Sequence, residues 1–227
     1  MMKLFHKENY KHYMIALLSL IVAVIAYPFL PEQIPVHFNA QGVVDNYGSP
    51  LMVFLFPVLL FGICILAEVS KHADPKASNY ALFSKHYYLF FLVVDLFLLL
   101  VHLYIISYSL DLFTFNISTL MTVLVGVLFI VMGNMMPKIK HNYFMGIKTP
   151  WTLANEQVWF DTHRFCGKLW FVLGIIVCIC GFLSSSLFVS ILLCIILAGV
   201  LIPFIYSYVI FKRINHKESN TENKPEE

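Results

Sequence analysis

Charged residues are scarce in this sequence: Asp, Glu, Lys and Arg make up only 12% of its 227 residues. Hydrophobic residues make up 59%, and the mean hydropathy is +0.78. This composition excludes an ordinary soluble domain, because so much apolar surface is stable only in lipid. The formal net charge of +2 is too small to predict direct binding of nucleic acid. The first partner that the sequence predicts is therefore the lipid bilayer.

Cysteine and the motifs of catalysis are scarce as well. The five cysteines lie mostly in apolar runs and are interpreted as small apolar side chains, without a disulfide framework. No phosphate loop, nucleophile elbow, HExxH or CxxC motif is present, so neither an enzyme nor a cofactor is predicted. A metal site needs about three or four converging ligands. The most polar early loop offers only Glu32, His37 and Asp45, so no metal site is predicted either.

Six apolar runs dominate what is present, and a transmembrane helix needs about 20 residues of this kind. Their residues do not alternate as those of β-barrel strands do, so we predict helices. The fold class is all-α: a polytopic membrane protein with six transmembrane helices. The first run is interpreted as a retained anchor, because no small-residue cleavage site follows it. The runs span residues 13–30, 51–68, 87–110, 117–136, 169–183 and 187–211.

The basic residues all fall on one side of this arrangement. The fifteen Lys and Arg precede the first run, follow the last, or lie in the second or fourth connection. The other side carries Glu32, Asp45 and Asp111 and no basic residue. The positive-inside rule therefore predicts that both termini are cytoplasmic.

This arrangement divides the chain into three predicted parts. Residues 1–68 form a two-helix unit with an ordered extracellular loop at 31–50. Residues 69–211 form a four-helix unit with a cytoplasmic loop at 137–168. Residues 212–227 form a disordered cytoplasmic tail.

The loop at 31–50 contains prolines that stiffen it and glycines that allow sharp turns, which indicates an ordered loop. Within it, His37, Asn39 and Asp45 are candidates for a small polar site that faces outward, with Gly42 at a turn. The alternative is a loop whose polar side chains form hydrogen bonds that only order the loop itself.

Ionisable residues are few inside the six runs. Asp95 and His102 lie seven residues apart in the third run, so both point to roughly the same helix face. A charge at membrane depth usually marks an internal partner or a pathway. The functional interpretation is a proton or ion route, and the alternative is a helix-to-helix hydrogen bond. Glu68, at the inner edge of the second run, is expected to reach water.

The longest polar interruption lies between the fourth and fifth runs. Thr149 is expected to be the N-cap of a helix, with Pro150 at its first position. From Asn155 onward, a rotation of about 100° per residue separates an apolar arc from a polar face, so an amphipathic helix should run into the fifth span. Asp161 and Arg164 are spaced to pair. The apolar arc comprises Val158, Trp159, Thr162, Phe165, Cys166, Leu169 and Trp170, and the polar face comprises Glu156, Gln157, Asp161, His163, Arg164 and Lys168.

Two interpretations of this helix stay open. It anchors the loop on the membrane interface or on the inner ends of the bundle. Alternatively, its exposed stripe of Gln157, Asp161, Arg164 and Lys168 binds another protein.

The run NYFMGIKTPWTLANEQVWFDTHRFCGKLW resembles the signature of the SdpI-type family of bacterial membrane proteins. The stretch LPEQIPVHFNAQGVVDNYGSP is similar to the amino-terminal domain of many members. Members often have Arg where this chain has Lys148, and a basic residue near the position of Pro50. The matching signature residues include Asn142, Gly146, Lys148, Thr149, Pro150, Trp151, Thr152, Leu153, Glu156, Val158, Trp159, Arg164, Gly167 and Lys168. The matching upstream residues are Pro31, Ile34, Pro35, His37, Asn39, Gly42 and Asp45.

This resemblance implies a multi-pass protein of the bacterial inner membrane that is not an enzyme. In the best-known arrangement of the family, the protein protects its cell from a secreted peptide toxin. It also holds a small transcriptional repressor at the membrane once toxin is present. The runner-up function is a small ion-coupled transporter or permease that uses Asp95 and His102.

Overall fold

The structure is a computed structural model that describes residues 9–39, 41–112, 115–183 and 185–222, and at 185–190 and 218–222 only the backbone. It is mostly helical, and six of its helical segments are long and apolar enough to cross a membrane, which confirms the predicted fold class. The helices are α1 (Tyr10–Ala26), α2 (Leu55–Ala73), α3 (Tyr80–Ser109), α4 (Ile117–Met135), α5 (Pro150–Ala154), α6 (Glu156–Cys180) and α7 (Ser185–Glu222). The strands are β1 (Ile34–Phe38) and β2 (Val44–Gly48), and short 3-10 turns include η2 (Pro50–Phe54) and η4 (Met136–Lys138).

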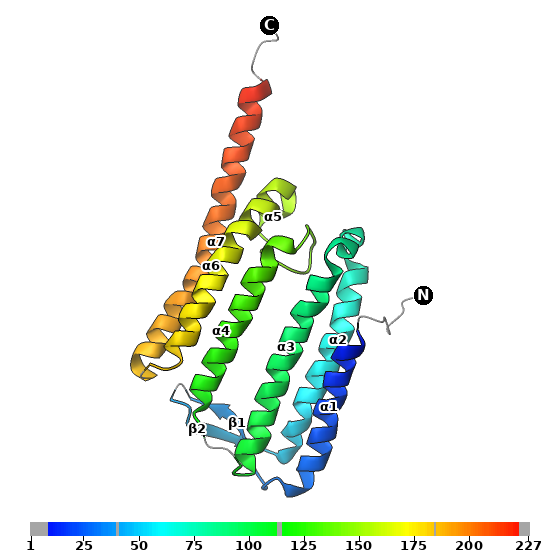
Figure 1. Cartoon of the computed structure of the whole chain (residues 1–227), viewed down its shortest axis with the longest axis vertical. Helices are drawn as coiled ribbons and strands as arrows, with labels where there is room; N and C mark the ends of the chain where they lie inside the picture. Colours follow the sequence, from blue (N-terminus) through cyan, green and yellow to red (C-terminus); the bar gives the residue numbers. More distant parts are fainter. Residues whose placement is uncertain (1–8, 40, 113–114, 184, 223–227) are drawn as a thin grey trace.

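The long helices form two groups that lie side by side (Figure 1). We call α1, α2 and α3 the amino-terminal group, and α4, α6 and α7 the carboxyl-terminal group. The strands lie at one end of the molecule, the hairpin end, and α5 lies at the other, the loop end. The division after residue 68 stays a prediction. Here α3 packs on both α1 and α2, which precede that boundary.

Glycines hold the carboxyl-terminal group together. Gly126 of α4 faces Gly174 of α6, and Gly133 of α4 faces Gly167 of α6. Within each helix the two glycines are seven residues apart. A Cβ atom built on Gly174 would lie 2.7 Å from the carbonyl oxygen of Gly126, and one on Gly167 would lie 2.7 Å from that of Gly133. Small residues at this spacing let two helix backbones approach closely in a membrane, where packing drives association.

The loop predicted at 31–50 is ordered, but it contains an antiparallel hairpin of β1 and β2 that the sequence did not indicate. Its turn is stabilised by Asn39, whose side-chain oxygen accepts hydrogen bonds from the backbone of Gln41 and Val43 at 3.0 Å each. Gly42 has a φ of +79°, which suits glycine. A Cβ atom there would lie 2.7 Å from the side chain of Asn116, so the hairpin rests on the start of α4.

The predicted disordered tail is wrong over most of its length, because α7 continues as one helix through Glu222. Residues 212–222 contain neither Gly nor Pro, the two residues that interrupt a helix most strongly. Residues 223–227 lie outside the described part of the chain. The end of α7 projects beyond the other helices at the loop end (Figure 1).

Candidate functional site

The segment 139–149, between η4 and α5, is the candidate site, and we call it the signature loop. Its centre is Asn142, which is completely buried. The side-chain oxygen of Asn142 accepts hydrogen bonds from the backbone N–H groups of Phe144, at 2.9 Å, and Met145, at 2.7 Å. Its amide donates to the carbonyl oxygens of Lys140, at 2.8 Å, and Met145, at 3.0 Å. One side chain thus fixes the path of the whole turn.

The connection between α2 and α3 holds this loop from the amino-terminal group. Asp74 is buried there, and its carboxylate accepts hydrogen bonds from the Tyr80 hydroxyl, at 2.7 Å, and from the backbone of Tyr143, at 2.8 Å. The Asn79 side chain donates to the carbonyl oxygen of His141 at 2.7 Å. Sequence reasoning missed Asp74. The sequence contained one signal: Asp74 is the single acidic residue in a connection whose other charged residues are all lysines.

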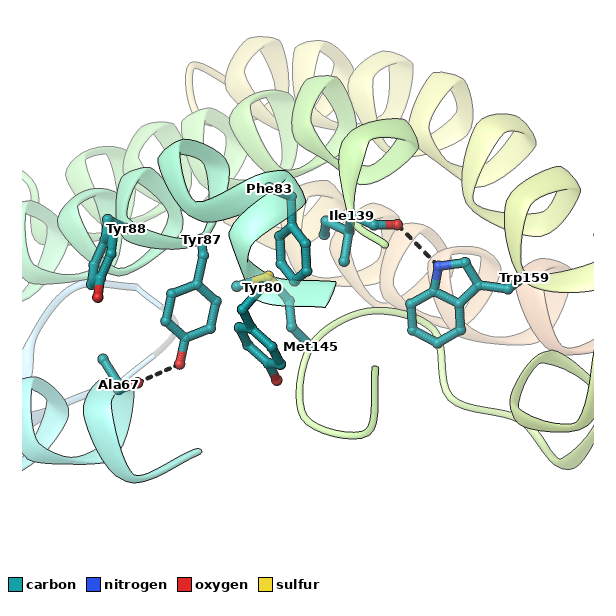
Figure 2. Close-up of a cluster of buried hydrophobic side chains, with 8 residues drawn as sticks. All are labelled: Ala67, Tyr80, Phe83, Tyr87, Tyr88, Ile139, Met145 and Trp159. Atoms are coloured by element: carbon teal, nitrogen blue, oxygen red, sulfur yellow. Dashed lines mark hydrogen bonds between the residues drawn. The ribbon is translucent and has the colours of Figure 1, made fainter. Parts of the chain in front are cut away.

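Helix α6 holds the loop from the other group. Trp159 donates from its ring nitrogen to the carbonyl oxygen of Ile139 at 3.0 Å. Figure 2 shows this bond, with Met145 and the aromatic rings of α3 in the same buried cluster. His163 accepts a hydrogen bond at Nε2 from the backbone of Ile147, at 3.0 Å, and its Nδ1 donates to the Trp159 carbonyl oxygen, at 2.8 Å. The two rings stack with centroids 4.0 Å apart.

His163 is therefore buried, with 1% of it exposed, although helical rotation grouped it with the polar face. Helical rotation alone treats histidine as polar, but this ring supplies the acceptor that the buried loop backbone needs. Gly146, beside it, has a φ of +108°, and a Cβ atom there would collide with the His163 ring. This contact and the positive φ together require glycine at position 146.

The expected helix start is confirmed. Thr149 is the N-cap of α5, with Pro150 at the first position, and it forms a capping box with Thr152. The Thr149 hydroxyl also donates to that of Ser207 on α7 at 3.0 Å. Trp151 packs on two aromatic rings of α7, each with a centroid distance of 5.0 Å. The start of α5 therefore joins the loop to α7.

The predicted amphipathic helix is split from α5 at Asn155, whose extended backbone and side chain cap the start of α6. From there α6 runs without interruption into the fifth span, as expected. Glu156, Arg164 and Lys168 are exposed. The structure pairs Asp161 with Gln157, which donates to it at 3.0 Å, in place of the Arg164 pair that the spacing indicated. Phe165, predicted on the buried arc, is 36% exposed and stacks on Tyr206 of α7.

A small charged group borders the loop. The ammonium group of Lys76 donates to Nδ1 of His141 at 2.6 Å, and a Glu156 oxygen lies 3.7 Å from the same nitrogen. Burial and then the charge of Lys76 lower the pKa of His141 below its ordinary value of 6.5, while Glu156 acts in the opposite direction. Lys148 donates from its ammonium group to the carbonyl oxygen of Phe144 at 2.9 Å. Through its contact with His141, the exposed Glu156 side chain touches the signature loop.

An apolar cavity of about 210 Å³ lies directly beneath the signature loop, between the two helix groups. Phe144 and Met145 close it at the loop end, Phe91 lines it from α3, and Met132 lines it from α4. Trp170 of α6 completes one wall. The signature loop thus closes the interface between the two helix groups at the loop end.

The two polar residues of the third span each have a partner on α1. His12 donates to Asp95 at 2.6 Å, and Ser19 Oγ lies 2.8 Å from His102 Nδ1. All four side chains are buried, and each pair is 83 residues apart in sequence, as two parallel helices in constant register require. These are the interhelical bonds of the packing alternative. Sequence reasoning missed both partners, although His12 and Ser19 repeat the seven-residue spacing.

The expectation that Glu68 reaches water is wrong, since it is completely buried. The start of α1 covers it, and Asn9 donates to its carboxylate. The Tyr88 hydroxyl also donates to it at 3.0 Å, and the Lys71 ammonium lies 3.3 Å away. Hydrophobicity placed this residue at a membrane edge but contained no information on which helix covers it.

At the hairpin end, the candidate polar residues separate into two roles. His37 donates to Asp45 at 2.5 Å across the strands, and both side chains are exposed. Asn39 and Gly42 shape the turn, as described above. Among the residues that the structure describes, no group of His, Cys, Asp or Glu could hold a metal ion.

The fold and this loop together define a class: a multi-pass α-helical membrane protein whose two helix groups are joined by a folded loop at one end. Residues 138–207 match the model of the SdpI/YfhL protein family, and residues 14–61 match that of a domain of unknown function (DUF1648). The chain is 27% identical to Immunity protein SdpI of Bacillus subtilis (strain 168) over 211 residues, which cover 92% of this chain and 98% of that protein. Both matches bear out the resemblance to the SdpI-type family that the sequence indicated. No solved structure matches it.

Proposed function

We propose that this protein is a membrane immunity protein that protects its cell from a secreted peptide toxin. The observation that carries the proposal is the similarity to Immunity protein SdpI, which extends over 98% of that protein. The six candidate spans support it, because they would place the protein in the cell membrane, which a secreted toxin reaches first.

The proposed orientation has the hairpin end outside the cell and the loop end in the cytoplasm. All fifteen basic residues of the sequence lie in the termini, in the two connections at the loop end, or in the parts of the helices next to those connections. The hairpin end carries Glu32, Asp45 and Asp111. This distribution supports the orientation through the positive-inside rule.

Expression of the full chain in toxin-sensitive cells tests the immunity function. The cells are mixed with cells that secrete a sporulation-delaying peptide toxin, and survival is compared with that of cells carrying an empty vector. We expect higher survival with the chain. Equal killing of cells that contain the chain in the membrane at normal abundance would contradict the proposal.

The finer part of the proposal is that the loop end recruits a cytosolic partner, a small transcriptional repressor. The supporting observation is that the start of α6 is held firmly by its buried face, whereas Glu156, Arg164 and Lys168 stay exposed. A lipid anchor alone requires no such ordered polar surface. An ordered, exposed surface of mixed charge suits a protein partner, because charge complementarity gives specificity.

A double substitution separates recruitment from anchoring. Glu156→Ala with Arg164→Ala leaves the buried face intact. The Arg164 change should alter the free energy of unfolding by no more than about 0.5 kcal/mol. The Glu156 change also removes the ion pairs with His141 and Lys76 and should cost no more than about 1 kcal/mol. Any small DNA-binding protein encoded beside this gene is fused to a fluorescent protein and imaged in cells. We expect it to reach the membrane with the parent chain and to stay cytosolic with the double variant. Trp159→Ala is the control that removes the buried face. Full recruitment by the double variant at equal abundance would assign α6 to anchoring.

A further inference from the structure

The hairpin end contains a pocket of about 570 Å³ that none of the roles above uses. The hairpin forms one side of it, and the end of α3 and the start of α4 form the other. The residues at its walls therefore come from the matched region 14–61 and from the segment between the two matched regions. We call it the outer pocket.

One wall of the outer pocket is aromatic and already packed. Tyr104 and Tyr108 contribute it from α3, with ring centroids 6.0 Å apart. Phe38 of β1 supports both rings from behind, at 6.1 Å and 5.4 Å. The Tyr104 hydroxyl donates to the carbonyl oxygen of Phe115 at 2.9 Å, which fixes the ring. Across the pocket, Tyr47 of β2 is 52% exposed.

The rim of the pocket is polar and acidic. Asp111 follows the end of α3 with a φ of +54°, a conformation that Asp tolerates better than most residues, and the residue is exposed. Gln33 and Gln41 line the pocket from the hairpin. Within the described residues, no hydrogen bond or ion pair engages the side chains of Asp111 or Gln33. The neighbouring Glu32 is also acidic, and no Lys or Arg of the sequence lies at this end.

We propose that the outer pocket binds a cationic segment of the secreted peptide, with an apolar side chain against the tyrosines and a Lys or Arg side chain at Asp111. Rigid tyrosine rings bury a large surface area at little cost in conformational entropy, and tyrosine is enriched at protein-binding interfaces. The acidic rim selects the charge of the ligand, because an anion finds no basic partner there. This inference rests on the proposed function and on the proposed orientation.

A binding assay with a defined probe tests the pocket. The full chain is placed in nanodiscs of zwitterionic lipid. The probe is a short fluorescent peptide of alternating Lys and Leu with one Trp, and the comparison peptide has Glu in place of each Lys. We expect the Lys peptide to bind more tightly than the Glu peptide and to weaken at high salt, since exposed charges are screened. Equal binding of the two peptides, or equal binding to empty nanodiscs, would overturn the proposal.

Two variants at the pocket locate the binding. Asp111→Asn keeps a residue that tolerates the same backbone, and we expect it to weaken binding of the Lys peptide by up to about fivefold. Tyr47→Ala removes an exposed ring that no core packing needs, and a central aromatic contact should cost at least about fivefold. The matched controls are Asp161→Asn and Tyr10→Ala, whose ring is 53% exposed at the loop end. Unchanged binding in both pocket variants would refute the site.

Survival assays separate the site from the function. If the parent chain protects cells and the variant with both Asp111→Asn and Tyr47→Ala protects them equally well, the site is wrong and the immunity function stands. If the parent chain itself gives no protection, the immunity function fails, and the peptide assay alone decides whether the pocket binds cationic peptides. Loss of protection in the double variant at normal membrane abundance supports the site.

Discussion

Substitution of Asn142 by Ala should loosen the signature loop without unfolding the helices. The change leaves the backbone N–H group of Met145 buried and without the acceptor that now lies 2.7 Å away, and it also removes the acceptor of the less buried N–H group of Phe144, at 2.9 Å. Each buried donor left unsatisfied costs about 1–3 kcal/mol. The buried Met145 donor alone then costs at least about 1 kcal/mol, which is roughly a fivefold shift in the opening equilibrium of the loop.

Hydrogen exchange of the purified chain in nanodiscs measures this opening residue by residue. We expect the amides of Phe144 and Met145 to exchange at least about fivefold faster, while those in the middle of α4 keep their rates. Asn155→Ala is a matched control, because that side chain also accepts from two backbone amides, at 2.8 Å and 3.1 Å, but at the start of α6. Its effect should be confined to that helix start. Unchanged exchange at positions 144 and 145 in the Asn142 variant would refute the reasoning.

Three further outcomes are expected. A cysteine probe at Gln41 should react with an impermeant reagent added to intact cells, and one at Asn155 should not; labelling at Asn155 would reverse the proposed orientation. Asp95→Asn should lower stability by about 1 kcal/mol, the usual scale of an interhelical bond in a membrane, and should leave toxin protection in place. Loss of protection with normal folding and abundance would instead favour the transporter. Because the pKa of His141 is lowered in the folded state, the unfolded state binds more protons. The loop should therefore be fully stable above about pH 6.5 and lose stability as the pH falls below it, and His141→Gln should reduce this loss in a thermal unfolding series.

Hydrophobicity was sufficient to predict the spans, because lipid requires long apolar helices and permits few alternatives. Local chemistry was sufficient for the Thr149 cap, whose partners lie within three residues. The strands at 34–38 and 44–48 were missed, because each has only five residues and their proline and glycine content is typical of a loop.

The other features that the sequence did not predict share one physical cause: each depends on a contact between segments that are far apart in the sequence. His163 is a polar residue type, so its sequence alone does not predict burial. It is buried because the backbone N–H of Ile147 donates to its ring nitrogen. Asp74 and His12 acquire their roles only from partners 69 and 83 residues away. Periodicity describes one helix at a time, so it could place Asp95 and His102 on one face but could not identify the helix opposite.

The glycine contacts between α4 and α6 restrict how the molecule can deform. Because the backbones touch at Gly126 and Gly133, a sliding or rolling motion of one helix against the other would drive main-chain atoms into each other. The pair must therefore move as a rigid body. The α3–α4 seam contains a cavity and soft methionine side chains, so it is the compliant joint of the fold. A displacement at the hairpin end would be transmitted along that joint, and the signature loop, bonded to both sides, would experience it as shear.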